Sequence, residues 1–163
     1  MQAGYEIFYL DESIFPLKPY LTRGWYCIGS RPTQKYVQTP YLKTCAFGAL
    51  GFGEVMTKLS PKANGKKYLA FIKRLHKHHP KLCIIVDNAR WHLTNDVMSF
   101  VKENDMKLIR LPPYSPELNP IEQYWKNVKN WLATRTWSTL PELKCQLRIA
   151  FTRRFLLPER YRY

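Results

Sequence analysis

The sequence predicts an α/β fold with a mixed five-stranded sheet, in which three antiparallel strands come first and parallel strands are added later, flanked by helices. Two patterns predict this class. Short, continuously apolar runs have the length of buried strands, and the later runs alternate with segments in which apolar residues recur at helical spacing. The 163 residues suit one domain, and a hydrophobic content of 45% is enough for a core.

The first half of the predicted sheet is an antiparallel meander. Residues 7–10, IFYL, form a continuous apolar run that stops at Asp11 and Glu12. Residues 22–28 and 43–52 are the next two expected strands, with glycines at their ends. Consecutive strands joined by short connections are typical of antiparallel neighbours.

The second half alternates helices with strands. One helix is expected to include residues 68–75 and to end at Pro80, and the next covers residues 93–101. The later helices are expected at residues 120–132 and from Thr139 to Phe151, where Thr139 and Glu142 have the spacing of a capping box. Residues 82–86 and 107–111 are the strands between these helices.

The charge distribution indicates a polyanionic partner. The chain has 26 Lys and Arg against 12 Asp and Glu, a formal net charge of +14. Such an excess repels itself within a compact fold, so it rarely serves stability. Residues 13–53 include no acidic residue, and residues 126–163 include nine basic and two acidic ones. Nucleic acid is the partner that this pattern favours, and a generic basic surface, as in ribosome-associated proteins, is the alternative.

Cysteine usage and hydropathy bear on the compartment. The four cysteines are widely spaced and include no C-x-x-C pair: Cys27, Cys45, Cys83 and Cys145. We expect them to be reduced core residues in a cytosolic-type compartment. We expect no signal peptide and no membrane partner, because a core strand is predicted close to Met1 and no stretch is long enough to span a bilayer.

Two aspartates directly follow predicted strands. Asp11 comes after residues 7–10 and Asp87 after residues 82–86. In open α/β sheets, the crevice beyond the strand ends is the usual ligand site. Two carboxylates brought together there repel each other unless a cation lies between them, and hard oxygen ligands select Mg²⁺ or Mn²⁺. Taken alone, each aspartate also fits an ordinary strand-end or turn residue.

A third carboxylate, Glu122, stands at the start of a proline-braced helix. Prolines stiffen the preceding segment RLPPYSPELNP, residues 110–120, and so fix where the helix begins. Asn119 can cap this helix, and Pro120 suits its first turn. Two structural alternatives remain open: Glu122 completes a capping box with Asn119, or it pairs with Lys126.

Two lysines are expected on the same helix face as Glu122. Lys126 and Lys129 follow it at i+4 and i+7. A carboxylate flanked by lysines on an exposed face suits a metal site beside a phosphate backbone. We therefore expect both lysines to contact DNA.

Three segments resemble the catalytic core of DDE transposases in the mariner superfamily, especially its bacterial and archaeal insertion-sequence branch. They are YLDES (9–13), VDNARWH (86–92) and LPPYSPELNPIEQYW (111–125). The 34 residues between Asp87 and Glu122 (122 − 87 − 1) match a spacing characteristic of that superfamily. RGWYCIGSRP, residues 23–32, is similar to the family's second-strand segment. The resemblance spans nearly the whole chain.

The resemblance implies a ribonuclease-H-like fold and a catalytic triad of Asp11, Asp87 and Glu122. It implies that these three side chains hold Mg²⁺ or Mn²⁺, with two ions per active site. Such an enzyme cleaves DNA phosphodiesters at transposon ends and joins those ends to target DNA. Because transposition holds two ends at once, we expect a homodimer or a higher assembly.

Further residues are expected near the metals or on DNA. Asn88 and His92 match the family's D-N-x-x-x-H pattern, which indicates either support of the metal ligands or substrate contact; a turn Asn and a helix-start His are the alternative. Glu12 also matches the family but is expected to face the opposite side of its strand from Asp11. The other DNA-contact candidates are Arg31, Arg90 and Arg148.

We expect residues 1–163 to be one catalytic domain without the helix-turn-helix modules that precede it in full-length relatives. Three explanations are open: a separate helix-turn-helix chain, a truncated copy, or a domain taken from a longer protein. The expected location is the cytoplasm of a prokaryote, at the nucleoid. Two alternatives to a transposase remain, namely an inactive DNA-binding remnant that regulates transposition and a nuclease of the same fold.

Overall fold

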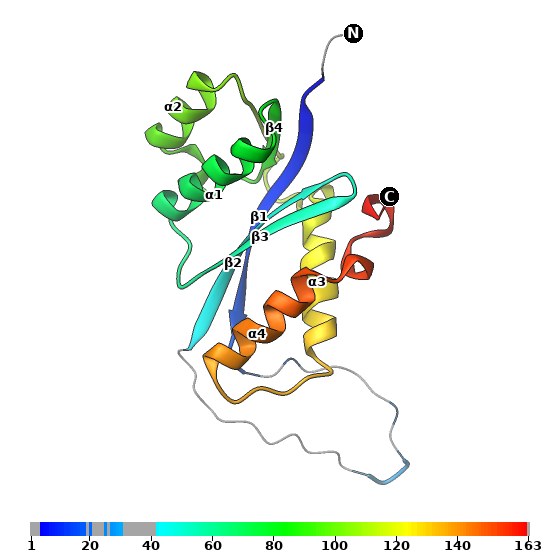
Figure 1. Ribbon diagram of the computed structural model, residues 1–163. Coiled ribbons are helices and arrows are strands. Elements are labelled where there is room, and N and C mark those ends of the chain that lie inside the picture. The colour runs from blue at the N-terminus through cyan, green and yellow to red at the C-terminus, as the bar shows by residue number, and fades with distance from the viewer. Residues whose placement is uncertain (1–3, 19, 21–24, 26, 31–41, 163) are drawn as a thin grey trace.

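The computed structural model describes residues 4–18, 20, 25, 27–30 and 42–162. A five-stranded sheet in the order β3-β2-β1-β4-β5 runs through the molecule, with helices on both faces (Figure 1). The strands are β1 (Glu6–Pro16), β2 (Lys43–Gly51), β3 (Glu54–Ser60), β4 (Leu82–Val86) and β5 (Lys107–Arg110).

Strand directions divide the sheet into two parts. β1 pairs antiparallel with β2, and β2 pairs antiparallel with β3. On the other side of β1, the pairs β1–β4 and β4–β5 are parallel. The predicted mixed sheet, antiparallel strands first and parallel strands later, is confirmed, and β1 is the strand on which the two parts meet.

Within the described residues, four α-helices cover the two faces. They are α1 (Gly65–His78), α2 (Asn95–Glu103), α3 (Pro120–Leu132) and α4 (Leu140–Phe151). Short 3₁₀ turns lie at Arg90–Leu93, Pro116–Leu118, Arg154–Leu156 and Glu159–Tyr161. All four helices correspond to segments that the sequence predicts, and the Thr139 hydroxyl accepts a hydrogen bond from the Glu142 N–H at 3.4 Å, which confirms that cap.

A separate apolar core fills each side of the sheet. Strand residues alternate in direction, so Phe8 and Leu10 of β1 pack with α1 and α2, whereas Phe15 packs with α3 and α4. By the same alternation Asp11 faces the α3 side and Glu12 faces the α1 side, as the sequence predicts. One strand therefore supplies acidic groups to both layers.

The third antiparallel strand is not the one expected. Part of the predicted strand 22–28 lies outside the described residues, and Cys27 to Ser30 form a turn in which the Ser30 N–H bonds to the Cys27 carbonyl at 3.0 Å. β3 at Glu54–Ser60 takes that place. This strand is only half-buried along most of its length, and its sequence lacks the continuous apolar run that marks β1 and β4.

Strand β1 also continues where an end was predicted. It runs to Pro16, so Asp11 lies in mid-strand. Backbone pairing with β2 sustains it, from Tyr9 opposite Leu50 to Pro16 opposite Lys43. Acidic residues are uncommon within strands, and for that reason the apolar run alone gave too early an end.

The cysteine expectation holds in part. All four thiols are free, but only Cys45 and Cys83 are buried, while Cys27 and Cys145 are exposed. Within the described ranges, no helix has the length and apolar character needed to cross a bilayer.

A close approach between β2 and α3 depends on Gly48. A Cβ at this position would come within 2.5 Å of the Trp125 ring and 2.8 Å of the Ile121 Cδ1 atom. Trp125 and Ile121 are both buried, with exposed fractions of 1% and 0%, so neither has space to retreat. The helix can lie this close to the sheet only because residue 48 has no side chain.

Replacement of Gly48 by Ala tests this packing. In an open strand position Ala is more stable than Gly by about 0.5–1 kcal/mol. Here we expect Gly48→Ala to lower the free energy of unfolding by about 1–3 kcal/mol, the usual effect of overpacking a core. Urea denaturation measures it, with Gly4→Ala as the control because a Cβ there meets nothing within 4 Å. A Gly48→Ala variant as stable as the wild type would contradict this packing.

Candidate active site

The register of two parallel strands brings Asp11 level with Asp87. The last paired residues of β1 and β4 are Tyr9 and Ile85. Asp11 and Asp87 each lie two residues further along, so the same offset of 76 residues relates them (85 − 9 and 87 − 11). Adjacent strands are about 4.8 Å apart, so the backbone positions of residues 11 and 87 are neighbours at the point where β4 ends.

Glu122 reaches the same place from the start of α3. After β5, residues 111–119 cross the carboxyl end of the parallel strands and deliver the chain into this helix, with Pro120 in its first turn. Asn119 is the N-cap residue, but its side chain makes no capping hydrogen bond. Its Nδ2 instead donates to the Leu10 carbonyl at 3.4 Å, which ties the helix start to β1.

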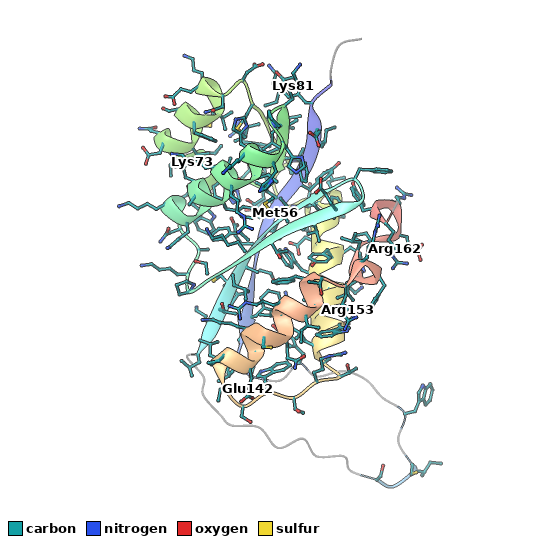
Figure 2. All side chains as sticks on the ribbon, in the orientation of Figure 1. Met56, Lys73, Lys81, Glu142, Arg153 and Arg162 are labelled. Atoms are coloured by element: carbon teal, nitrogen blue, oxygen red, sulfur yellow. The ribbon has the colours of Figure 1, made fainter. Side chains whose placement is uncertain are left out.

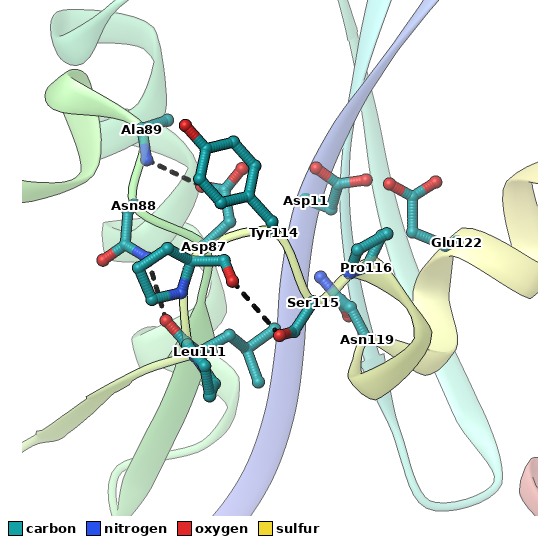
Figure 3. Close-up of a pocket in the computed structure, with 12 residues that line it drawn as sticks. Asp11, Asp87, Asn88, Ala89, Leu111, Tyr114, Ser115, Pro116, Asn119 and Glu122 are labelled. Carbon is teal, nitrogen blue, oxygen red and sulfur yellow. Dashed lines mark hydrogen bonds between the residues drawn. The ribbon is translucent and has the colours of Figure 1, made fainter.

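The three carboxylates line one pocket of about 410 Å³. Figure 3 shows Asp11 and Glu122 facing each other, with Asp87 and Tyr114 on the neighbouring wall. The proline-rich loop forms much of the remaining lining. The alternatives for Glu122 are not realised, because in the described part of the chain it has neither a capping hydrogen bond nor an ion pair with Lys126.

Asp11 is held in an unfavourable electrostatic environment. Burial, followed by the negative charge of Glu122, raises the pKa of Asp11 from 3.8 to about 7, and the charges of Glu12 and Asp87 add to the effect. A hydrogen bond from the Glu12 backbone works in the opposite direction. The Trp125 indole N–H also donates to Asp11 Oδ2 at 3.0 Å. The Asp11 carboxyl therefore stays protonated to a higher pH than an ordinary aspartate, and a bound cation would favour its ionised form.

Asp87 has the opposite tendency. It is half-exposed, and the His92 ring, together with the Ala89 backbone N–H at 2.9 Å, lowers its pKa below 3.8 despite partial burial. The His92 Nδ1 atom lies 2.8 Å from Asp87 Oδ1, an ion-pair contact without the alignment of a good hydrogen bond. Asp87 is therefore ionised under ordinary conditions.

His92 links Asp87 to Glu12 on the α1 side of the sheet. Its ring is fully buried, and its Nε2 lies 3.0 Å from Glu12 Oε1. Burial alone would lower the pKa of His92, but the close contacts with Asp87 and Glu12 and their negative charges together raise it to about 9. A protonated His92 thus carries positive charge between two carboxylates and fixes the orientation of Asp87.

Asn88 connects two loops of the pocket. Its side-chain Nδ2 donates to the Leu111 carbonyl at 2.8 Å. This bond joins the residue after Asp87 to the start of the proline-rich loop. Asn88 and His92 therefore both contact the segments that carry the carboxylates.

The pocket fits a divalent cation. Its acidic groups are three carboxylates, which are hard oxygen donors of the kind that Mg²⁺ and Mn²⁺ prefer. The negative charges of Glu122 and Asp87 contribute to the raised pKa of Asp11, so a positively charged ligand would relieve this repulsion. The buried Asn119 Oδ1, which has no hydrogen-bond partner among the described residues, adds a further acceptor to the lining.

The basic residues predicted to contact DNA differ in position. Lys126 is exposed and lines a shallow hollow beside Glu122. Lys129 is half-buried, with its ammonium 5.9 Å from the Phe15 ring centre. Arg90 and Arg148 are exposed, the first three residues after Asp87 and the second on α4. Arg31 lies outside the described residues.

Positive charge is spread over both sides of the molecule. Figure 2 shows Lys73 and Lys81 on the α1 and β4 side, and Arg153 and Arg162 beyond α4. Proximity to Glu122 therefore separates Lys126 from the other basic residues, and Arg90 is distinguished by its position three residues after Asp87.

A second acidic cluster lies away from this pocket. Glu6, Glu54 and His79 meet at the start of β1. Nδ1 of His79 is 2.8 Å from Glu6 and Nε2 is 3.5 Å from Glu54, so each ring nitrogen already faces a carboxylate. This arrangement is that of an ion-pair cluster joining β1, β3 and the end of α1.

Sequence comparison identifies the family. The model of the DDE superfamily endonuclease family matches residues 6–144, which include all three pocket carboxylates. The chain belongs to the DDE superfamily endonuclease family.

Two curated proteins resemble this DDE superfamily member. The insertion element IS630 uncharacterized 39 kDa protein of Shigella sonnei is 28% identical over 155 residues, with 87% of this chain and 44% of that protein aligned. An uncharacterized protein of Sinorhizobium fredii is 35% identical over 79 residues, which cover 48% of this chain and 56% of that protein. The chain spans about half the length of these relatives.

Solved structures share the fold. The mariner Mos1 paired-end complex with Mg matches with a TM-score of 0.75 at 18% identity, over 96% of this chain and 50% of that one. The Mos1 transposase catalytic domain matches with a TM-score of 0.67 at 16% identity, over 90% and 70%. At such identities the likeness concerns the fold alone, and the predicted ribonuclease-H-like fold is confirmed.

Sequence reasoning missed three contributors to the DDE pocket. Trp125 belongs to a predicted helix but was not expected at the site, although its indole N–H reaches Asp11. The contact between Glu12 and His92 spans 80 residues and has no local signal. Tyr114 was also missed; it is fully exposed on the pocket wall with φ of 57°, a backbone conformation uncommon for a residue with a side chain. Its position between prolines was the available hint.

The raised pKa of Asp11 predicts a pH-dependent stability difference. Without a cation, the folded state binds the Asp11 proton more tightly than the unfolded chain does. The stabilisation of the folded state by this proton is therefore full below about pH 3.8 and is lost as pH rises through about 7. Asp11→Asn is always neutral. As pH rises from 4.5 to 8, the free energy of unfolding of Asp11→Asn should increase relative to that of wild type by on the order of 2–4 kcal/mol.

Urea denaturation with a chelator measures this difference. Asp96→Asn, which changes an exposed carboxyl on α2, is the matched control and should show no comparable trend. A gap between Asp11→Asn and wild type that stays constant across this pH range would contradict the raised pKa.

Proposed function

We propose that residues 1–163 form the catalytic domain of a transposase that cleaves DNA phosphodiesters and joins the resulting ends to target DNA. Asp11, Asp87 and Glu122 are the catalytic residues in this proposal. The observation that carries it is the meeting of these three carboxylates, from β1, the residue after β4, and α3, around one pocket in a DDE superfamily member.

Divalent cations would supply the electrophilic chemistry. Asp11, Asp87 and Glu122 would hold Mg²⁺ or Mn²⁺, with two ions per site in the working enzyme. Bound there, such ions lower the pKa of a water or 3′-hydroxyl nucleophile and stabilise the leaving oxygen. Mg and Mn appear in the names of Mos1 complexes that share this fold, which supports the choice of ion.

The protein's own residues provide placement. Asp87 stays ionised because His92 lies against it, and His92 is fixed in turn by Glu12. Asn88 holds the proline-rich loop by its bond to Leu111, and this loop sets the start of the helix that carries Glu122. With the ligands already oriented, little reorganisation remains for the reaction itself.

DNA is the proposed substrate. The net charge of +14 favours a polyanion. Lys126, exposed beside Glu122, and Arg90, exposed three residues after Asp87, are the proposed phosphate contacts nearest to the carboxylates. Lys129, Arg148 and Arg31 are proposed as more distant contacts. Similar structures include Mos1 transposase with transposon-end DNA, which supports this substrate.

The working assembly is proposed to be a homodimer or larger, because two DNA ends must be processed together. We also propose that recognition of the ends requires a helix-turn-helix module, on the same longer chain or on a separate one. A prokaryotic nucleoid is the proposed location, supported by the likeness to an insertion-element protein of Shigella sonnei.

A nicking assay on supercoiled DNA tests the proposed chemistry. We expect cleavage that requires Mg²⁺ or Mn²⁺ and falls by at least about 1,000-fold in Asp87→Ala, since a lost metal ligand removes most of the stabilisation that the metal provides. Asp96→Ala, at an exposed site on α2, is the matched control and should cleave like wild type.

The outcomes separate three functions. Equal activity in wild type and Asp87→Ala, or no cleavage by either, would favour a non-catalytic DNA-binding regulator. Cleavage without joining of a pre-cut end to target DNA would favour a nuclease of the same fold.

Salt dependence tests the proposed DNA interface. We expect DNA affinity to fall by about 100-fold or more between 50 and 200 mM salt, the loss produced by about four phosphate contacts. Lys126→Gln should reduce the slope of log K against log salt by about 1. Lys73→Gln on α1, where the ammonium lies over the Phe100 ring, is the control and should leave the slope unchanged. Fluorescence anisotropy measures each value, and a flat wild-type dependence would refute the interface.

A further inference from the structure

Trp125 connects the helix of Glu122 with the carboxylate of Asp11. It lies three residues after Glu122 on α3, nearly one helical turn, and is 1% exposed. Its indole Nε1–H donates to Asp11 Oδ2 at 3.0 Å. The same helix therefore carries one pocket carboxylate and holds a second.

The sheet makes room for this contact at Gly48. Asp11 is paired with Gly48 in the antiparallel register of β1 and β2, so both positions face α3. The atoms that an added Cβ would meet first are Cζ2 and Cη2 of Trp125, at 2.5 and 2.7 Å. The indole ring thus occupies the space left by the missing side chain, directly beside the carboxylate.

In the contact between Trp125 and Asp11, the indole is always the donor and the carboxyl group is the acceptor. An indole N–H can only donate, so it favours the ionised carboxylate over the protonated acid at the oxygen it contacts. A buried donor whose ring cannot move fixes that oxygen and so restricts rotation of the carboxyl group. Asp11 is then presented to the pocket in a single orientation, together with Glu122.

We propose that Trp125 is a positioning residue for cation binding, which orients Asp11 through the indole N–H and relies on Gly48 for access. The proposal rests on the proposed function, because it assumes that Asp11, Asp87 and Glu122 hold a divalent cation. A purely structural role is the competing explanation, since a buried indole N–H needs some acceptor. Only the positioning role links this N–H to cation affinity.

Mn²⁺ binding to the full chain tests the proposal. Trp125→Phe keeps an aromatic ring and removes the N–H. We expect its affinity for Mn²⁺, measured from the free-ion signal in electron paramagnetic resonance, to be about 10-fold or more weaker than that of wild type. Trp131→Phe, a half-buried tryptophan on the same helix with Arg135 stacked on its ring, is the matched control and should bind Mn²⁺ as wild type does.

Nuclear magnetic resonance of the wild type gives an independent measurement. The Trp125 indole N–H signal, assigned by its loss in Trp125→Phe or by backbone assignment, should shift with added Mg²⁺ and saturate. The Trp131 signal should not move. This arm does not depend on the folding of any variant.

The outcomes distinguish the two proposals. Two results would overturn the positioning role alone. One is unchanged Mn²⁺ affinity in folded Trp125→Phe, and the other is a Trp125 indole N–H signal that does not shift with Mg²⁺ although the wild type binds the ion. If Asp87→Ala binds Mn²⁺ as wild type does, the cation does not sit at the three carboxylates, and the proposed function fails first. Weaker binding in Trp125→Phe, with Trp131→Phe unchanged, supports both.

Discussion

The parallel register between β1 and β4 is the constraint on which the site depends. Because Tyr9 pairs with Ile85, Asp11 and Asp87 are level with each other, and a shift of one residue would turn one of them to the opposite face. The two apolar cores fix this register from either side of the sheet. Packing energy spread over the whole domain thus keeps two acidic residues at the same pocket.

Holding acidic groups together is unfavourable, and the surrounding residues offset this in different ways. Asp87 has a buried imidazole against it, whose positive charge is shared with Glu12. Asp11 receives a neutral indole donor, and its pKa stays high at about 7. Asp87 is therefore charged before any cation binds, whereas the ionised form of Asp11 is the one that a bound cation stabilises most. The pocket is arranged to bind a cation, and these contacts stabilise the folded state when no cation is bound.

The sequence predicted the parts that depend on local patterns. Continuous apolar runs located β1 and β4, the helical spacing of apolar residues located all four helices, and prolines marked the segment before Glu122. β3 was missed because a half-buried strand has no such run, and β1 was ended too early because Asp11 interrupts its apolar character. Asn119 suits a capping role by type, yet its amide bonds to Leu10 instead, since the helix start is pressed against β1.

The sequence by itself determined the fold class through its apolar periodicity. The resemblance of its motifs and their spacing to a known family indicated the family and which three carboxylates to consider. Only the tertiary structure decided how those groups are supported. The contacts of Trp125 with Asp11 and of His92 with Glu12 join residues 114 and 80 positions apart. Such contacts arise from strand register and from the close approach at Gly48, and neither leaves a periodic signal in the sequence.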